Sequence, residues 1–107
     1  MSGASPTHLT LKHLRAEGWP LVEVTEKWNP HARIRQDLFG FVDVLAVGPQ
    51  GVLAVQTTSV DHVSHRVAKI ADHPNVAAVR EAGIAIHVHG WAKKSGRWVL
   101  ARDVDVS

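Results

Sequence analysis

The spacing of apolar residues predicts a helix and then a strand at the start of the chain. Leucines recur at near-helical spacing after Ser5-Pro6, a pair that favours a helix start, which predicts a helix over residues 7–17. Apolar and polar side chains alternate in residues 21–27 and predict a β-strand. Asn29-Pro30 is a turn signal, so the Arg-rich residues 31–37 predict a loop or an irregular strand edge.

Two apolar runs in the middle of the chain predict a β-hairpin. Residues 39–47 and 52–58 are separated by Gly48-Pro49-Gln50-Gly51, which we interpret as a four-residue connection. Both runs are apolar almost throughout, so both faces of each strand are expected to be covered. The hairpin is therefore expected in the centre of a sheet.

The rest of the chain predicts helices and then two strands. Valines and an isoleucine at steps of three and four indicate an amphipathic helix over residues 60–70, and a shorter one is expected over residues 75–82. Residues 84–89 and 97–106 predict the final strands. The order α-β-β-β-α-(α)-β-β packs naturally as one mixed sheet flanked by helices, an α/β fold that forms a single domain over residues 1–107.

Composition excludes several classes of function. The 107 residues contain no cysteine, which excludes disulfides, thiolate metal sites and a cysteine nucleophile. No apolar run approaches the length of about 20 residues that spans a membrane, and residues 1–8 lack the design of a signal peptide, so a cytoplasmic protein without a membrane partner is expected. The net charge of +2 permits a nucleic-acid partner without requiring one.

Asp43 is the most informative residue because it lies inside an apolar run. An unpaired buried carboxylate is very costly, so Asp43 must be paired, bound to a metal or protonated. Hairpin pairing brings it near Gln56, and with the backbone carbonyl of Thr57 these groups make an oxygen site of the kind that Mg²⁺ favours. The alternative is structural: Asp43 pairs with an arginine and Gln56 ends a strand. The residues alone leave the two interpretations balanced. The candidate arginines are Arg33, Arg35 and Arg66.

Residues 7–70 resemble the PD-(D/E)XK nuclease superfamily. The run from Arg33 to Asp43, Arg-x-Arg-x-Asp-Leu-Phe-Gly-Phe-x-Asp, and the Val-Gln-x-Thr-Ser segment that follows are similar to small phage-type nuclease-like proteins. Holliday-junction resolvases and VRR-type nucleases share this core. The resemblance implies a restriction-endonuclease-like core in the order α-β-β-β-α-β. It also implies an endonuclease that hydrolyses DNA with Mg²⁺ or Mn²⁺, structure-selective on branched or junction DNA and acting as a homodimer.

The resemblance also implies catalytic residues. Glu23 or Glu26 would be the first carboxylate, and Asp43 matches the metal-binding Asp of the second strand. Gln56 stands where the family usually has Asp or Glu, and its amide oxygen can still bind a metal. Thr58 stands where the family usually has Lys. Lys69 on the following helix, one turn after Arg66, is the candidate replacement.

Other residues near these are candidates for DNA contacts. Arg33 and Arg35, with Arg66, suit the phosphate backbone, and Trp28 suits a base or sugar. Asp37 is either a further metal carboxylate or the partner of a neighbouring arginine, and the second interpretation is slightly favoured.

His87 and His89 suggest zinc, because alternate residues of a strand share one face. No third ligand is evident, and alternation with apolar residues indicates that both histidines face outward, so zinc is the less favoured interpretation.

Two alternatives to the nuclease stay open. One is an inactive nucleic-acid-binding module, which Thr58 favours, and the other is a protein-interaction factor, which the modest net charge favours.

Overall fold

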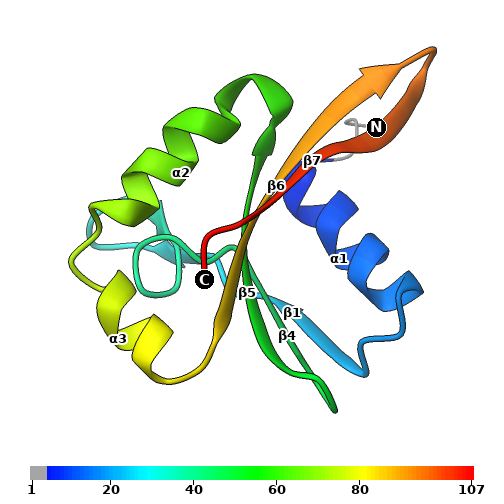
Figure 1. Ribbon diagram of the computed structural model, residues 1–107. Coiled ribbons are helices and arrows are strands. Elements are labelled where there is room, and N and C mark those ends of the chain that lie inside the picture. The colour runs from blue at the N-terminus through cyan, green and yellow to red at the C-terminus, as the bar shows by residue number, and fades with distance from the viewer. Residues whose placement is uncertain (1–4) are drawn as a thin grey trace.

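A mixed sheet of five strands organises the computed structural model, which describes residues 5–107 (Figure 1). Residues 1–4, which belong to the segment without signal-peptide features, lie outside the described residues. No helix among residues 5–107 is long and apolar enough to cross a membrane. The strands lie in the order β1 (Leu21–Val24), β4 (Val44–Gly48), β5 (Gly51–Ser59), β6 (Ala85–Lys94) and β7 (Arg97–Asp105).

The chain connects these strands by hairpins and one crossover. β4 pairs antiparallel with both β1 and β5, and β7 pairs antiparallel with β6. β5 and β6 are parallel, which requires a crossover connection. The crossover consists of a 3-10 turn, η1 (Val60–His62), and the helices α2 (Val63–Ala71) and α3 (Val76–Glu81).

Helices cover both faces of the sheet, as the alternation of buried side chains requires. Helix α1 (Pro6–Ala16) packs on one face, and α2 and α3 pack on the other (Figure 1). The core on the α1 face consists of Leu14, Val22, Val44, Ala46, Leu53 and Val55. The core on the opposite face consists of Phe41, Val42, Ala54, Val63, Ile70, Val76, Val79, Ile86 and Val88. The α/β fold with a mixed sheet flanked by helices is therefore confirmed.

Most predicted elements are confirmed close to their expected positions. The first helix begins at Pro6, where the Ser5 hydroxyl accepts a hydrogen bond from the His8 N–H at 3.2 Å. The two helices after the hairpin occur as η1 with α2 and as α3. The hairpin is central in the sheet, but its connection is shorter than predicted. Because Gly48 pairs with Gly51, only Pro49-Gln50 lies between the strands.

Three predicted elements are corrected. The strand over residues 21–27 ends at Val24, and β2 (Lys27–Asn29) instead pairs with β3 (Ile34–Gln36) in a separate two-stranded sheet. The loop or irregular strand edge expected over residues 31–37 therefore contains a paired strand. The Asn29 side chain stabilises the turn between these strands, because its Oδ1 accepts from the N–H groups of His31 and Ala32 at 3.0 and 3.1 Å.

The third correction changes the surroundings of Asp43. The strand predicted to begin at Phe39 begins only at Val44. Phe39 and Gly40 both have positive φ, +58° and +90°, so the chain turns there, and the extended ladder starts after Asp43. Asp43 therefore lies at the entrance of β4 instead of inside it.

Candidate carboxylate site

Asp43 is buried directly before β4, and two residues of β5 donate hydrogen bonds to one of its carboxylate oxygens. Only 5% of its surface is exposed. Asp43 Oδ2 accepts hydrogen bonds from Gln56 Nε2 at 2.9 Å, from the Thr57 N–H at 2.8 Å and from Thr57 Oγ1 at 3.2 Å. The prediction that hairpin pairing brings Asp43 beside Gln56 is confirmed. Within residues 5–107 no arginine pairs with Asp43, so the alternative of an Asp43–arginine pair is wrong.

The same hydrogen bonds connect Asp43 to the first turn of α1. The Thr57 hydroxyl donates its proton to Asp43, so the Thr7 hydroxyl, 2.9 Å away, donates to Thr57 Oγ1. A helix, a strand end and a turn thus hold this carboxylate in a defined position.

Glu26 and Asp37 complete a cluster of three carboxylates with Asp43. One oxygen from each of the three lies within 4.8 Å of the others. Glu26 lies between β1 and β2, and Asp37 directly follows β3. The pairing of β2 with β3 therefore brings two of the three carboxylates to the entrance of β4.

Burial and the neighbouring negative charges raise the proton affinity of Asp37. Burial, a hydrogen bond with the Asp43 side chain and the charges of Asp43 and Glu26 raise the pKa of Asp37 from 3.8 to about 7, against the opposing effect of Lys69. Adjacent carboxylates retain a proton because two ionised groups repel each other. A bound cation removes the same repulsion, which makes this cluster suitable for a metal ion.

The cluster lies in a cavity of about 430 Å³ that also contains cationic side chains. Arg35 contacts Glu26 at 3.1 Å, and Arg66 reaches the cavity from α2. The cavity is lined by Pro6, Thr7, Glu26, Arg35, Asp37, Asp43, Gln56, Thr57, Thr58, Ser59 and Arg66. It can therefore accept a cation on its carboxylates and an anion beside its arginines.

Two buried polar atoms of the cavity residues have no hydrogen-bond partner in the described part of the chain. They are Gln56 Oε1 and Arg66 Nε. The Gln56 amide must present its NH₂ group to Asp43, which leaves its oxygen unpaired. Because buried polar groups are nearly always satisfied, Gln56 Oε1 is free to accept from a hydrogen-bond donor or to bind a cation, and Arg66 Nε is free to donate to an acceptor or an anion.

The structure gathers many of the predicted site residues and separates others. Asp43, Gln56, Thr57 and Thr58 line the cavity with Glu26, Arg35 and Arg66. Four predicted residues do not line it. Glu23 is exposed and pairs with Leu45 on the sheet edge, Arg33 is exposed in the β2–β3 turn, and Trp28 is 58% exposed on β2. Lys69 is exposed on α2, although its charge reaches Asp37.

Asp37 was interpreted either as a further metal carboxylate or as the partner of a neighbouring arginine, and the second interpretation was slightly favoured. The structure instead places its carboxyl group beside those of Asp43 and Glu26. The glycine inside the run Leu-Phe-Gly-Phe was the available signal, because Gly40 permits the turn that folds Asp37 back toward Asp43.

His89 also departs from its expected place. Strand alternation places His87 and His89 on one face of β6, as predicted, but that face lies under α1. His89 is only 1% exposed, so the expectation that both histidines face outward is wrong for it.

Comparison of the chain with family models, curated proteins and solved structures finds no match in any of the three. The PD-(D/E)XK resemblance therefore stays a prediction that depends on the residues of this chain.

Proposed function

We propose that this protein is a metal-dependent nuclease that hydrolyses phosphodiester bonds of DNA. The observation that carries the proposal is the convergence of Glu26, Asp37 and Asp43 within 4.8 Å in a cavity that also contains two arginines. Hard divalent cations such as Mg²⁺ or Mn²⁺ prefer such carboxylate oxygens, and a phosphate needs the neighbouring positive charge.

In this proposal the three carboxylates hold the metal, and Gln56 contributes its unpaired amide oxygen. Thr57 has a further role besides the backbone-carbonyl ligand first expected. Its N–H and hydroxyl both donate to Asp43, so it fixes the orientation of that carboxylate. A metal held here would polarise the phosphate and lower the pKa of an attacking water.

The chain supplies the remaining groups. Asp37, with a pKa of about 7, changes protonation near neutral pH, so it can release its proton to solvent and bind the metal as a carboxylate. Arg66, whose buried Nε has no partner among residues 5–107, is placed to contact a phosphate oxygen. Thr58 lines the cavity without a charge, so positive charge comes from Arg66 and Arg35, with Lys69 nearby.

The architecture supports the same proposal. A β4–β5 hairpin, a helical crossover and a parallel β6 are compatible with the restriction-endonuclease-like core that the resemblance implies. Cutting both strands of a junction needs two sites, so we retain the homodimer as part of the proposal.

The test is cleavage of linear, nicked, flapped and four-way DNA with Mg²⁺ or Mn²⁺, with Asp43→Asn compared with Glu23→Gln. Glu23 is an exposed carboxylate outside the cavity and serves as the matched control. We expect Asp43→Asn to abolish cleavage and Glu23→Gln to retain it. A folded Asp43→Asn protein that still cuts would refute the proposal.

The second candidate function is a DNA-binding module without cleavage, favoured by Thr58 in the family's lysine position. It predicts salt-dependent binding that is insensitive to divalent metal, with no cutting of any substrate. A chain that binds no DNA at low salt would favour the protein-interaction factor instead.

A further inference from the structure

Two histidines and an aspartate meet on the α1 face of the sheet, away from the carboxylate cavity. His87 and His89 are alternate residues of β6, and the β6–β7 register places Asp103 directly opposite His89 and Asp105 opposite His87. We propose that His87, His89 and Asp103 form a second metal site, which binds a divalent transition-metal ion such as Zn²⁺.

The ligand atoms of this group already face one another. Asp103 Oδ1 lies 2.7 Å from His87 Nδ1 and 3.5 Å from His89 Nε2. Ligand atoms in a tetrahedral zinc site lie about 3.3 Å apart, given metal–ligand distances of about 2.0 Å. His87 and Asp103 are partly exposed, so small side-chain rotations can bring all three to that spacing.

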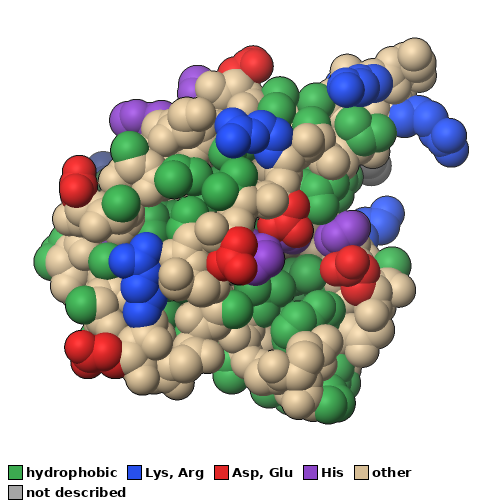
Figure 2. Space-filling view, in the orientation of Figure 1, with side chains coloured by type: hydrophobic (Ala, Val, Ile, Leu, Met, Phe, Trp, Pro, Cys, Tyr) green, Lys and Arg blue, Asp and Glu red, His purple; other side chains and the backbone are tan. Residues whose placement is uncertain are grey.

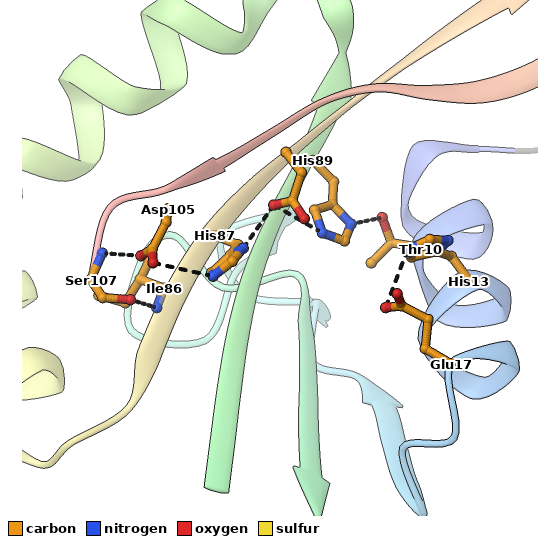
Figure 3. A network of polar contacts seen from close by, with 9 residues as sticks. Thr10, His13, Glu17, Ile86, His87, His89, Asp105 and Ser107 are labelled. Atoms are coloured by element: carbon orange, nitrogen blue, oxygen red, sulfur yellow. Dashed lines mark hydrogen bonds and ion pairs between the residues drawn. The ribbon is translucent and has the colours of Figure 1, made fainter. Parts of the chain in front are cut away.

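His89 is oriented by buried groups behind it, as metal-binding histidines usually are. Its Nδ1 lies 3.1 Å from Thr10 Oγ1, and that hydroxyl accepts a hydrogen bond from Trp91 Nε1 at 2.9 Å. Thr10 is fully buried and His89 is 1% exposed. Figure 3 shows this arrangement, in which Thr10 reaches His89 from α1. The contacts turn His89 Nε2 toward Asp103.

His87 also has a polar residue near its second ring nitrogen, as His89 has Thr10. Its Nε2 lies 3.8 Å from Asp105 Oδ2, and the N–H of Ser107 donates to Asp105 Oδ1 at 2.9 Å (Figure 3). Both imidazoles thus direct one nitrogen toward Asp103 and have the other nitrogen near a second polar group. A carboxylate outside the ligands commonly holds a metal-binding imidazole in this way.

An ion-pair network is the alternative explanation of these contacts. A buried histidine is more often held by hydrogen bonds than by an exposed charge, yet His89, at 1% exposure, directs its Nε2 to Asp103 at 3.5 Å. Both residues line the same cavity with His87, which is the arrangement that a metal ion needs.

The site also opens on a cavity. A hollow of about 310 Å³ is lined by His87, His89 and Asp103 together with Glu17 of the α1 C-cap. In Figure 2 histidine and acidic side chains gather near the middle of the molecule beside a hollow with hydrophobic walls. Three protein ligands with an open position are typical of zinc sites that admit water or a further ligand.

The two sites differ in the metals that they favour. Imidazole ligands select Zn²⁺ and its neighbours in the transition series, whereas carboxylate and amide oxygens select Mg²⁺ or Mn²⁺. The proposed zinc site shares no residue with the carboxylate cavity, so it does not depend on the proposed nuclease function.

The experiment is a Zn²⁺ titration of the EDTA-treated full chain against a chromophoric chelator, in excess Mg²⁺ to occupy the carboxylates. We expect binding of one Zn²⁺ per chain and a rise in melting temperature. His87→Gln and Asp103→Asn, at partly exposed positions, should each weaken binding at least about tenfold. His62→Gln, an exposed histidine of η1, and Asp43→Asn should leave binding unchanged.

A second measurement keeps the test independent of variant stability. In ¹⁵N spectra of the wild-type imidazoles, Zn²⁺ should shift the signals of His87 and His89 ahead of those of the other histidines. The proposal is overturned if the wild type binds no more Zn²⁺ than Asp103→Asn does. It is equally overturned if Zn²⁺ shifts only histidines outside β6.

Discussion

The carboxylate cavity and the histidine cluster respond to burial in opposite directions. In the cavity, burial and neighbouring negative charges raise the pKa of Asp37 to about 7, so this acid retains a proton. Under α1, burial lowers the pKa of His89 to about 4, so this base loses one. Both groups move toward their neutral forms, because a poorly solvated site disfavours charge of either sign.

The clusters also differ in how the chain builds them. Glu26, Asp37 and Asp43 all lie outside the strands of the five-stranded sheet. His87, His89 and Asp103 belong to two paired strands, and strand register alone brings them together. The comparison teaches that strand register within the five-stranded sheet places the histidine cluster, whereas segments outside that sheet place the three carboxylates.

The largest expected effect separates the clusters by metal. Asp43→Asn should reduce Mg²⁺-dependent DNA cleavage at least about 100-fold without changing Zn²⁺ affinity, because it removes a charge only from the carboxylate cavity. His87→Gln should do the converse. Cleavage rates and Zn²⁺ titrations of both variants measure this. If either variant impairs both properties while folded, the two clusters are not independent.

The next effect concerns the turn that brings Asp37 to Asp43. Gly40 has φ +90°, and a Cβ there would overlap the His73 ring, which itself packs on Phe41 at a centroid distance of 5.2 Å. Gly40→Ala should therefore destabilise the fold by more than the 1–2 kcal/mol or so that left-handed backbone alone costs, and should reduce cleavage.

Gly18→Ala is the matched control for that turn. Gly18 has φ +95°, and a Cβ there meets nothing within 4 Å among the described residues, so it should show the backbone cost alone. Urea unfolding of both variants gives the two free energies. Equal destabilisation by the two substitutions would contradict the role given to His73.

A smaller effect is the pH dependence of stability, to which Asp37 and His89 should contribute with opposite signs. The folded chain binds the Asp37 proton more tightly than the unfolded chain, so the stabilisation by this group is lost as pH rises from 3.8 to about 7. Folded His89 binds its proton more weakly, so its contribution is lost as pH falls from 6.5 to about 4. The free energy of unfolding of the wild type, measured over this pH interval, shows whether the contribution of Asp37 or that of His89 is larger.

Asp37→Asn separates the two contributions. Without the Asp37 carboxyl, stability should rise more steeply with pH over the same interval, because the opposing effect is gone. Substitution of the exposed Asp61 by Asn is the control and should leave the slope unchanged. A slope that Asp37→Asn leaves unchanged would exclude a raised Asp37 pKa.

The smallest effect is a pH-dependent stabilisation by Mg²⁺. Because Asp37 must release its proton to bind a cation, the increase in melting temperature with Mg²⁺ should be greater above pH 7 than below it. Thermal unfolding at fixed Mg²⁺ across this range measures the effect. Asp37→Asn should abolish the pH dependence, and its persistence would assign the proton to another group.

Local patterns in the sequence were enough to predict most of the fold. The Ser5-Pro6 helix start, the central hairpin and the amphipathic helix after it are confirmed, since each is encoded by neighbouring residues and by which face is apolar. Asp43 beside Gln56 was also predictable, because a hairpin brings residues at equal distances from its turn together.

Only the tertiary structure decided which further residues join each cluster. The choice of Glu26 over Glu23 and the inclusion of Asp37 depend on the β2–β3 pairing and on the turn at Gly40. Asp103 joins the histidines through the β6–β7 register, and α1 buries His89. Periodicity records which face of an element is apolar, whereas these contacts depend on register and packing between distant segments, which no single stretch of residues encodes.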